Sequence, residues 1–447
     1  MDKQPRARIS SRHENRQFPN GGAPVLKPED NERLVRVGPG TPAGELFRRY
    51  WQPACLSSEL PENDGPAIKV RLLCEDLIAY RDTTGAVGLV DAYCPHRLAP
   101  MYFGRNEECG LRCAYHGWKF DRDGKCVDMP TEAPDSRLKE RVSIKAYPVV
   151  ERGGVVWTYM GPKEHMPEPP DYEWTRVPHT HCHVSKTYEE CNYLQALEGG
   201  LDTAHSSFAH NNAIDKKTEM RQIDTAPRLD VETTDYGYYY VSHRNLGDGN
   251  FYVRLYHYVM PFQQMRGGIH KFDGKRKDFP VVDGHIWAPI DDGQTHVYNW
   301  HHGYDESVKL TPEHIDEAEI FYGRGPDDMI PGTFKLKKNK SNDYGRDFHL
   351  MKTKIFTGIT GINTQDFALQ EGMGPIVDRS KEHLGSTDRA IITMRRLLLE
   401  ATHDVEAGRT PRGLDPKTHG HMRPHDNFVK AGDDWRAIFE PEIKAKF

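Results

Sequence analysis

Two short loops, each with one cysteine and one histidine, constrain the fold of this chain more than any other feature. They are Cys94-Pro95-His96-Arg97 and Cys113-Ala114-Tyr115-His116, so the pattern is C-x-H, sixteen residues, C-x-x-H. Such a set can bind one tetrahedral zinc ion, or a [2Fe–2S] cluster with two Cys on one iron and two His on the other. Zinc sites more often separate the two ligand types along the chain. Here each loop mixes them, which favours the cluster.

The residues around these loops predict a small all-β domain. Segments 68–73, 77–80, 87–90 and 155–159 are apolar and β-branched, and Gly, Asp and Pro turns separate them. Residues 41–51, before the strands, read as a short helix capped by Thr41. The Pro-rich run 162–170 changes the composition of the chain, so we expect a domain boundary near residue 165.

A second candidate ligand set follows in Asp202, His205 and His210. Two imidazoles with one carboxylate suit iron(II) and leave coordination positions open for O₂ and substrate. Residues five apart lie roughly 140° apart around a regular helix, so a helix must end or bulge between the two histidines. The preceding segment 189–200 is predicted as a helix broken at its two glycines. The alternative interpretation is a loop with two partly buried histidines.

The third ligand is not chosen by spacing, because Asp366, Glu371 and Asp378 are all available near the C-terminus. Between the second ligand set and this region, apolar and polar residues alternate over 228–300, as they do in an antiparallel sheet. A basic segment, 266–277, interrupts the alternation. We interpret it as a solvated turn, and a docking surface for an acidic redox partner is the less favoured alternative. Residues 390–407 have apolar side chains at helical spacing.

Composition excludes several functions. The formal net charge of −6 gives no support for nucleic-acid binding, which usually needs a basic surface. No apolar run of 18 residues occurs, so no membrane span is expected. The polar N-terminus lacks the apolar core of a secretory signal. Of the eight cysteines, four lie between 94 and 126, which favours metal binding in a reducing compartment over a disulfide framework. We therefore expect a cytoplasmic protein.

Both ligand sets occur in the order found in one known family. The chain resembles the α (oxygenase) subunit of the Rieske non-haem iron aromatic-ring-hydroxylating oxygenases, in particular the phthalate-dioxygenase-like subgroup. The likeness extends from about Val35 to Gly408. It rests on the two cysteine–histidine loops and on Asn192-Tyr193-Leu194-Gln195, Glu198-Gly199, Asp202-x-x-His205-x₄-His210 and Gln365-Asp366.

The resemblance implies an α+β protein with a defined domain order. Residues 1–34 would be an N-terminal extension and 35–165 the all-β Rieske [2Fe–2S] domain with its leading helix. Residues 166–447 would form the catalytic mononuclear iron domain, a helix-grip (START-like) antiparallel sheet with C-terminal helices. The cluster would be held by Cys94, His96, Cys113 and His116, and the mononuclear Fe(II) by His205, His210 and Asp366.

The same resemblance implies a homotrimer or stacked trimers. Asp202 corresponds to the family's bridging carboxylate, which would link His116 of one subunit to His205 of its neighbour. No nicotinamide- or flavin-binding fingerprint such as G-x-G-x-x-G is visible, so electrons from NAD(P)H must come through a separate reductase, possibly one with a ferredoxin domain. The cofactors implied are the cluster, Fe(II) and O₂.

The expected substrate is an aromatic acid, with Arg254 pairing with its carboxylate. The alternative for Arg254 is a surface arginine on a strand edge. The reaction would be cis-dihydroxylation of the ring, as for phthalate or benzoate. O-demethylation or ether cleavage of methoxylated or phenoxy aromatic acids is the alternative, and both belong to aromatic catabolism. A pure electron-transfer Rieske protein is a distant alternative, because it would not need the second domain.

Overall fold

The computed structural model describes residues 26–214, 220–247, 249–271 and 275–447. Two short helices come first, α1 (Pro28–Val35) and α2 (Pro42–Phe47). Thr41 caps α2, because its hydroxyl accepts a hydrogen bond from the amide of Gly44. The predicted helix over 41–51 is therefore confirmed for its first part, and Trp51 already belongs to the first strand.

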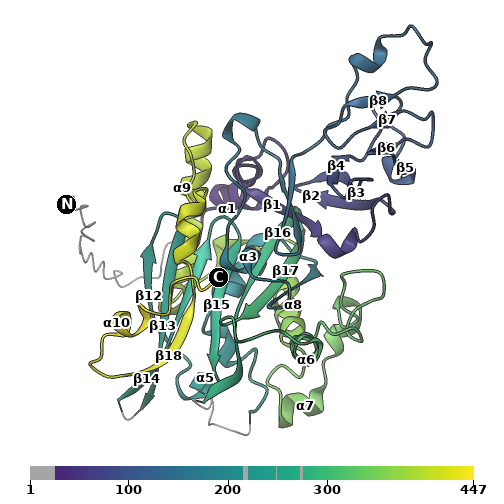
Figure 1. The fold of residues 1–447 in the computed structure, drawn as a ribbon. Helices are drawn as coiled ribbons and strands as arrows, with labels where there is room; N and C mark the ends of the chain where they lie inside the picture. Colours follow the sequence, from purple (N-terminus) through teal and green to yellow (C-terminus); the bar gives the residue numbers. More distant parts are fainter. Residues whose placement is uncertain (1–25, 215–219, 248, 272–274) are drawn as a thin grey trace.

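The first domain is built entirely from short antiparallel strands, as predicted (Figure 1). One sheet has the order β1-β10-β9 and a second the order β2-β3-β4. A third sheet, β5-β6-β7-β8, lies at the far end of the domain from the rest of the chain. The strands are β1 (Trp51–Leu56), β2 (Ile68–Leu72), β3 (Glu75–Arg81), β4 (Val87–Asp91), β5 (Arg105–Glu107), β6 (Gly110–Arg112), β7 (Lys119–Phe120), β8 (Cys126–Asp128), β9 (Val149–Arg152) and β10 (Val155–Tyr159).

The second domain is a large antiparallel sheet with helices. Its order is β11-β17-β16-β15-β14-β13-β12, and β18 adds to β14. The strands are β11 (Cys182–Glu189), β12 (Arg228–Thr233), β13 (Gly237–Gly247), β14 (Asn250–Val259), β15 (Gln263–His270), β16 (Arg276–Asp291), β17 (Gln294–Gly303) and β18 (His425–Lys430). The helices are α3 (Glu173–Arg176), α4 (Tyr193–Leu201), α5 (Met220–Ile223), α6 (Pro312–Tyr322), α7 (Phe348–Thr353), α8 (Ile362–Gly372), α9 (Arg389–Glu406) and α10 (Trp435–Phe439).

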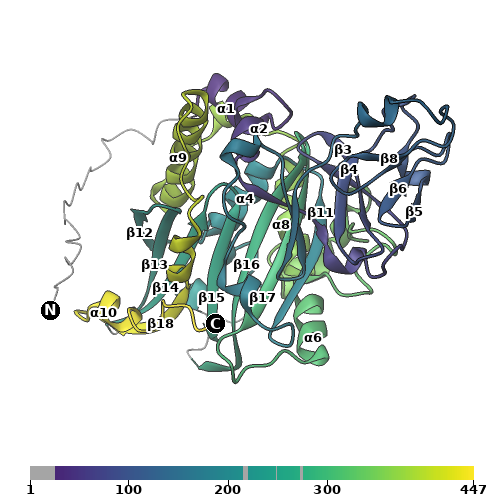
Figure 2. The same ribbon diagram turned by 45° about the horizontal axis from the view of Figure 1, so that its top comes forward.

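Helix α4 is central to the arrangement of the second domain. It packs on β15, β16 and β17 and contacts both α8 and α9 (Figure 2). The prediction that this helix breaks at its glycines is wrong, because α4 continues through both to Leu201. A Cβ on Gly199 would lie 1.9 Å from Nε2 of Gln370, and one on Gly200 would lie 2.1 Å from the Trp287 ring. The glycines permit close packing and do not end the helix.

The helix predicted over 390–407 is confirmed as α9, which packs on α2, β12 and β13. Its apolar stripe is buried, as the helical spacing predicts: Ile391, Met394, Leu397, Leu398 and Ala401. Helix α1, which begins inside the expected extension 1–34, also contacts α9. No helix in the described part of the chain combines the length and the apolar character needed to cross a membrane.

Two cores support the two ligand sets. A large one runs from α1, α2 and β1 through the second domain. A smaller one lies within the outer part of the first domain and includes Cys94 and Cys113 together with Leu111, Trp118 and Phe120. The first pair of loops therefore stands on a packed base of its own.

Candidate metal centres

The two cysteine–histidine loops have matching geometry. Cys94 donates its amide to the carbonyl of Ala99 at 2.9 Å, and Cys113 donates its amide to the carbonyl of Trp118 at 2.8 Å. Each loop is thus closed over the next few residues. Gly117 has φ +76° and lies where an added Cβ would be 2.7 Å from Pro130, so glycine is required there.

The cysteines lie inside and the histidines lie outward. Cys94 and Cys113 are almost fully buried, whereas His96 and His116 are partly exposed. The two imidazole rings are 4.5 Å apart, and His96 stacks on Trp118. Burial raises the pKa of the Cys94 thiol to about 11, with Cys113 adding to the effect. The Cys94 thiol would remain protonated without a bound metal to stabilise its thiolate.

This arrangement fits a two-iron cluster better than one zinc ion. A single tetrahedral zinc needs four ligand atoms at about 2.0–2.3 Å from one point, and therefore close to one another. Among the described residues, the four side chains of the loops do not form a compact group whose ligand atoms all lie within 4.8 Å of one another. Ligands divided between two irons are spread more widely.

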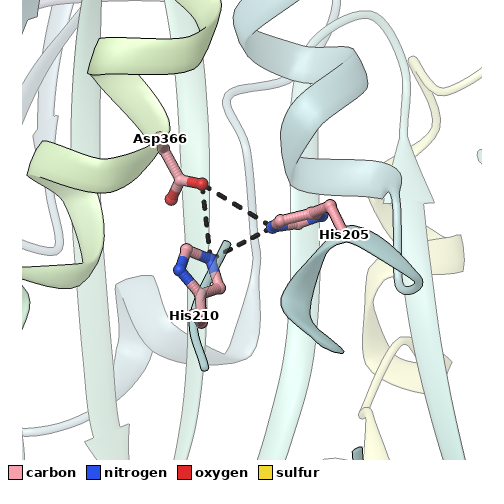
Figure 3. A group of neighbouring side chains, drawn as sticks. All are labelled: His205, His210 and Asp366. Carbon is pink, nitrogen blue, oxygen red and sulfur yellow. Dashed lines mark hydrogen bonds and ion pairs between the residues drawn. The ribbon is translucent and has the colours of Figure 1, made fainter. Parts of the chain in front are cut away.

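The second ligand set does form a compact group (Figure 3). The Nε2 atoms of His205 and His210 are 3.0 Å apart. Oδ1 of Asp366 lies 3.6 Å from the first and 3.3 Å from the second. Metal–ligand distances of about 2.1 Å at right angles would separate neighbouring ligands by about 3 Å. The three side chains therefore fit one face of an iron ion and leave its other face open.

The chain makes this possible by ending α4 before the first histidine. Leu201 ends the helix, and His205–Ser207 form a short 3₁₀ turn. The prediction that a regular helix cannot join the two histidines is confirmed. The structure also selects among the three candidate acids, because Asp366 lies on the face of α8 that points at the histidines. Asp378 instead caps a 3₁₀ turn, and Glu371 binds the hydroxyl of Tyr344.

Asp202 lies beside the triad on its outer side. Its Oδ2 is 3.6 Å from Nδ1 of His205, and its Oδ1 accepts the amide of Ala204. Burial raises the pKa of Asp202, but the contacts with His205 and Ala204 outweigh burial, so the net pKa is lowered. The carboxylate stays charged and partly exposed, at 22% of its side-chain surface.

A cavity of about 380 Å³ opens from the triad, which falls in the range of small-molecule sites. His205, His210 and Asp366 lie on its wall, as does Arg254. The other basic side chains that line it are Arg221, Arg244, Arg266, Lys271 and Lys277, against the acids Glu189, Asp202, Asp283 and Asp366.

The interpretation of 266–277 as a solvated turn is wrong for its ends. The segment continues β15 and begins β16, whose pleat turns Arg266 and Lys277 towards the cavity, while 272–274 lie outside the described residues. Arg266 forms an ion pair with Asp283 on the neighbouring strand. The sequence did not identify Arg266, Lys277 or Glu189 as site residues. The available signal was the alternation of side chains between the two faces of each strand, and the run of charged residues obscured it.

An all-β domain with a two-iron ligand set, followed by an antiparallel-sheet domain with a two-histidine, one-carboxylate site, defines a two-centre iron oxygenase. Comparison with known proteins agrees. The family described as Rieske [2Fe-2S] domain matches residues 50–148, and the family described as LigXa C-terminal domain like matches residues 158–446.

Similar proteins cover almost the whole chain. It is 36% identical to the phthalate 4,5-dioxygenase oxygenase subunit of Pseudomonas putida over 92% of this chain and 94% of that one. It is also 36% identical to the 3-chlorobenzoate-3,4-dioxygenase oxygenase subunit of Comamonas testosteroni, over 93% and 98%. Among solved structures, dicamba monooxygenase shares the fold with a TM-score of 0.57 at 18% identity, over 81% of this chain and 99% of that one.

The chain therefore belongs to the Rieske non-haem iron oxygenases, as an oxygenase subunit. Members of this family carry a Rieske cluster and a mononuclear iron, and they use O₂ with electrons supplied by a separate reductase. A solved structure with the same fold holds the oxygenase of carbazole 1,9a-dioxygenase in complex with its ferredoxin, at 17% identity and a TM-score of 0.55.

Proposed function

We propose that this chain oxidises an aromatic acid by cis-dihydroxylation of its ring, and that Arg254 binds the carboxylate. The observation that carries the proposal is a guanidinium on the wall of the triad's cavity that has an unused donor. Nε of Arg254 is buried and has no hydrogen-bond partner among the described residues. A buried donor without a partner is costly, and a carboxylate would satisfy it.

Arg254 lies in the interior of the sheet and not at its edge. Its strand, β14, pairs with β13, β15 and β18. One terminal nitrogen of Arg254 donates to the carbonyl of Gly267, which fixes the plane of the guanidinium. Burial lowers the pKa of Arg254, but nearby Tyr256, Tyr252 and Asp426 raise it more, so the group stays charged. An immobile charged fork suits the planar carboxylate of a benzoate.

The metal ligands follow the family pattern residue by residue. Cys94, His96, Cys113 and His116 would hold the cluster, and His205, His210 and Asp366 the mononuclear iron. When bound at these residues, the cluster would supply electrons one at a time and the iron would supply O₂ activation beside the substrate. The protein's own contribution is to orient the two imidazoles, to bind the substrate carboxylate and to exclude bulk water from the cavity.

A neighbouring copy would complete the electron path, and we propose a homotrimer or stacked trimers. Asp202 presents a charged carboxylate at the surface beside His205, where it can accept a hydrogen bond from His116 of a second copy. Exposed apolar side chains lie around the cluster loops and around the triad. Leu98 and Tyr115 lie in the cluster loops, and Phe208, Ile223 and Phe356 lie near the triad's 3₁₀ turn or in contact with it.

O-demethylation of a methoxylated aromatic acid is the second candidate. The chain is 33% identical to the 5,5'-dehydrodivanillate O-demethylase oxygenase subunit of Sphingobium sp. over 87% of this chain and 84% of that one. It is similarly related to a tert-butanol monooxygenase oxygenase subunit of Aquincola tertiaricarbonis, so the relatives of this chain differ in reaction. Arg254 would bind the carboxylate of a methoxybenzoate in the same way.

The test is a substrate screen with the reconstituted enzyme, a reductase and NADH. Benzoates, phthalates and methoxybenzoates are each offered as the acid and as the methyl ester. Diol and formaldehyde are measured together, and Asp366→Ala serves as the inactive control. We expect the diol to form from an acid and not from its ester. Formaldehyde without diol would favour the demethylase, and equal turnover of acids and esters would overturn the role of Arg254.

A further inference from the structure

A buried acid lies on the cavity wall away from the two centres. Glu189 is the last residue of β11, and its side chain is 0% exposed. It lines the same cavity as the triad, beside Val297 and Gln370. Its Oε1 accepts a hydrogen bond from the Cys191 thiol at 3.3 Å, and its Oε2 has no hydrogen-bond partner among the described residues. The cavity wall therefore includes a buried acid, one of whose carboxyl oxygens has no hydrogen-bond partner among the described residues.

The surroundings of Glu189 favour its neutral, protonated form. Burial raises the pKa of Glu189 well above its usual value, and the charges of Glu371 and Asp366 on α8 raise it further. The Cys191 thiol is the one group that lowers it. The other acids of the cavity differ, because Asp202 and Asp366 contact the triad histidines and Asp283 is paired with Arg266. Among the acids of the cavity, Glu189 is thus the one whose surroundings favour the acid form.

A second acid lies directly behind it. Oε1 of Glu371 accepts the amide of Glu190 at 2.9 Å, so its carboxyl group is beside the residue next to Glu189. Its Oε2 accepts the hydroxyl of Tyr344 at 2.5 Å. Burial also raises the pKa of Glu371. Glu189 and Glu371 are therefore neighbouring acids, and the surroundings of both raise the pKa of the carboxyl group.

Tyr344 connects this pair to the outside. It lines a separate cleft with Glu371, Glu190 and Lys335, and the side chains of the last two are each 46% exposed. Phe367 lines both the cleft and the cavity, so the wall between them is thin. Tyr344 has φ +56°, a left-handed conformation that a bulky side chain rarely adopts, directly after Asp343 at φ +50°. Strain of this kind persists where the structure over-determines it, often at functional sites.

We propose that Glu189 supplies protons to the cavity during turnover and that Glu371 and Tyr344 reload it from the cleft. This inference rests on the proposed function, because dihydroxylation joins one arene with O₂, two electrons and two protons. The electrons come from the reductase. Glu189 gives its proton to the cavity and becomes a carboxylate. The carboxyl of Glu371 then passes a proton to it, and Glu371 regains a proton from Tyr344, which takes one in turn from the solvent of the cleft.

The first measurement does not depend on turnover. Infrared difference spectra of the metal-loaded, substrate-free protein are compared between wild type and Glu189→Gln. The isosteric change is matched by Glu190→Gln, which removes the neighbouring exposed carboxylate that pairs with Lys335. We expect the carbonyl band of a protonated carboxylic acid at neutral pH to disappear in Glu189→Gln and to persist in Glu190→Gln. If Glu189→Gln keeps the full wild-type band, the proposal is overturned.

The second measurement is the coupling of O₂ consumption to product. We expect Glu189→Gln to bind substrate as wild type does but to form product about tenfold more slowly or worse, with the lost O₂ released as hydrogen peroxide. Tyr344→Phe keeps Glu189 and should show a smaller loss that grows in D₂O. Wild-type coupling in Glu189→Gln would overturn the proposal. If wild type itself oxidises no aromatic acid, the proposed function fails, while the infrared result still decides whether Glu189 holds a proton.

Discussion

Nδ1 of His210 lies 2.9 Å from Oε1 of Gln365, the residue that precedes Asp366. The amide of Gln365 cannot turn over, because its nitrogen donates to Asn212 and to the carbonyl of Ile359, both at 2.8 Å. Its oxygen is therefore the acceptor, so the proton of His210 is on Nδ1. The lone pair of Nε2 then points at the other two triad residues. One buried amide thus fixes both the tautomer and the direction of a ligand.

Replacing Gln365 by Leu should weaken iron binding at the triad. Loss of the acceptor frees the His210 ring to rotate and to change tautomer, and such losses typically cost about 10–100-fold in metal affinity. The measurement is iron retention against a competing chelator. The absorbance of the Rieske cluster is the internal control, because it should be unchanged if the fold is intact. Unchanged iron retention would show that Gln365 does not orient the ligand.

Changing Asp202 to Asn should leave both metals bound and slow electron transfer between them. The change keeps the shape of the side chain but removes the charge beside His205. The measurement is a single turnover, in which pre-reduced enzyme is mixed with substrate and O₂ and the cluster is followed by its absorbance. Cluster oxidation at the wild-type rate would rule out a bridging role.

The sequence predicted both ligand sets, because each is local. C-x-H and C-x-x-H lie within tight loops, and His205 and His210 are only five residues apart. Spacing alone could not choose the third ligand among Asp366, Glu371 and Asp378, and only the family resemblance indicated Asp366. The choice depends on how α8 packs on α4, and that packing depends on Gly199, one of the two glycines that the sequence suggested as a helix break.

The cavity wall was the hardest part to predict. Arg266 and Lys277 belong to a run of charges that suggests solvent, but strand pleating turns both towards the cavity. Glu189 offered no signal, because it belongs to none of the matched motifs. Its burial and its missing partner are visible only once β11, β17 and α8 are assembled. Local motifs thus identified the chemistry, and tertiary packing determined the environment.

Replacing Arg254 by Met should weaken binding of the aromatic acid. A hydrogen bond to a charged group contributes about 1.5–3 kcal/mol, so the dissociation constant should rise about ten- to a hundredfold. Binding is measured directly by calorimetry on the anaerobic enzyme. Arg228→Met is the matched control, because Arg228 is an exposed strand arginine paired with Asp230. An equal loss for the acid and for its methyl ester would indicate a packing effect instead.

The acid sensitivity of the fold should depend on Asp426. This buried residue of β18 accepts the amides of Ile269 and His270. Burial raises the pKa of Asp426, but His270, Arg254 and the Ile269 amide lower it more, to about 2. Its pKa in the unfolded chain is about 3.9, so its ionisation stabilises the fold by on the order of 2 kcal/mol above pH 4. That stabilisation is lost as the pH falls from about 4 to about 2.

Asp426→Asn should therefore be less stable than wild type at neutral pH, and the difference should shrink as the pH falls through this window. The measurement is urea unfolding, followed by tryptophan fluorescence, at a series of acidic pH values. Asp433→Asn, an exposed change on the segment that follows the same strand, is the control and should keep the wild-type pH dependence. The same pH dependence in Asp426→Asn and wild type would contradict the assignment.

Mixed oligomers test whether electrons pass between copies of the chain. One variant, Cys113→Ser, lacks the cluster, and another, His210→Ala, lacks the mononuclear iron. Neither alone can turn over. If electrons pass within one chain, hybrids of the two also stay inactive, because no chain has both centres. If they pass from the His116 side of one copy to the Asp202 side of the next, some interfaces in a hybrid join an intact cluster to an intact triad.

In randomly assembled rings with equal amounts of each variant, the donor and the acceptor are both intact at about one quarter of the interfaces. We therefore expect about a quarter of wild-type turnover from the whole co-expressed mixture, and about a third from doubly tagged trimers, because each mixed trimer has one such interface. Hybrids that assemble with both metals present and still show no activity would refute the neighbouring-copy path.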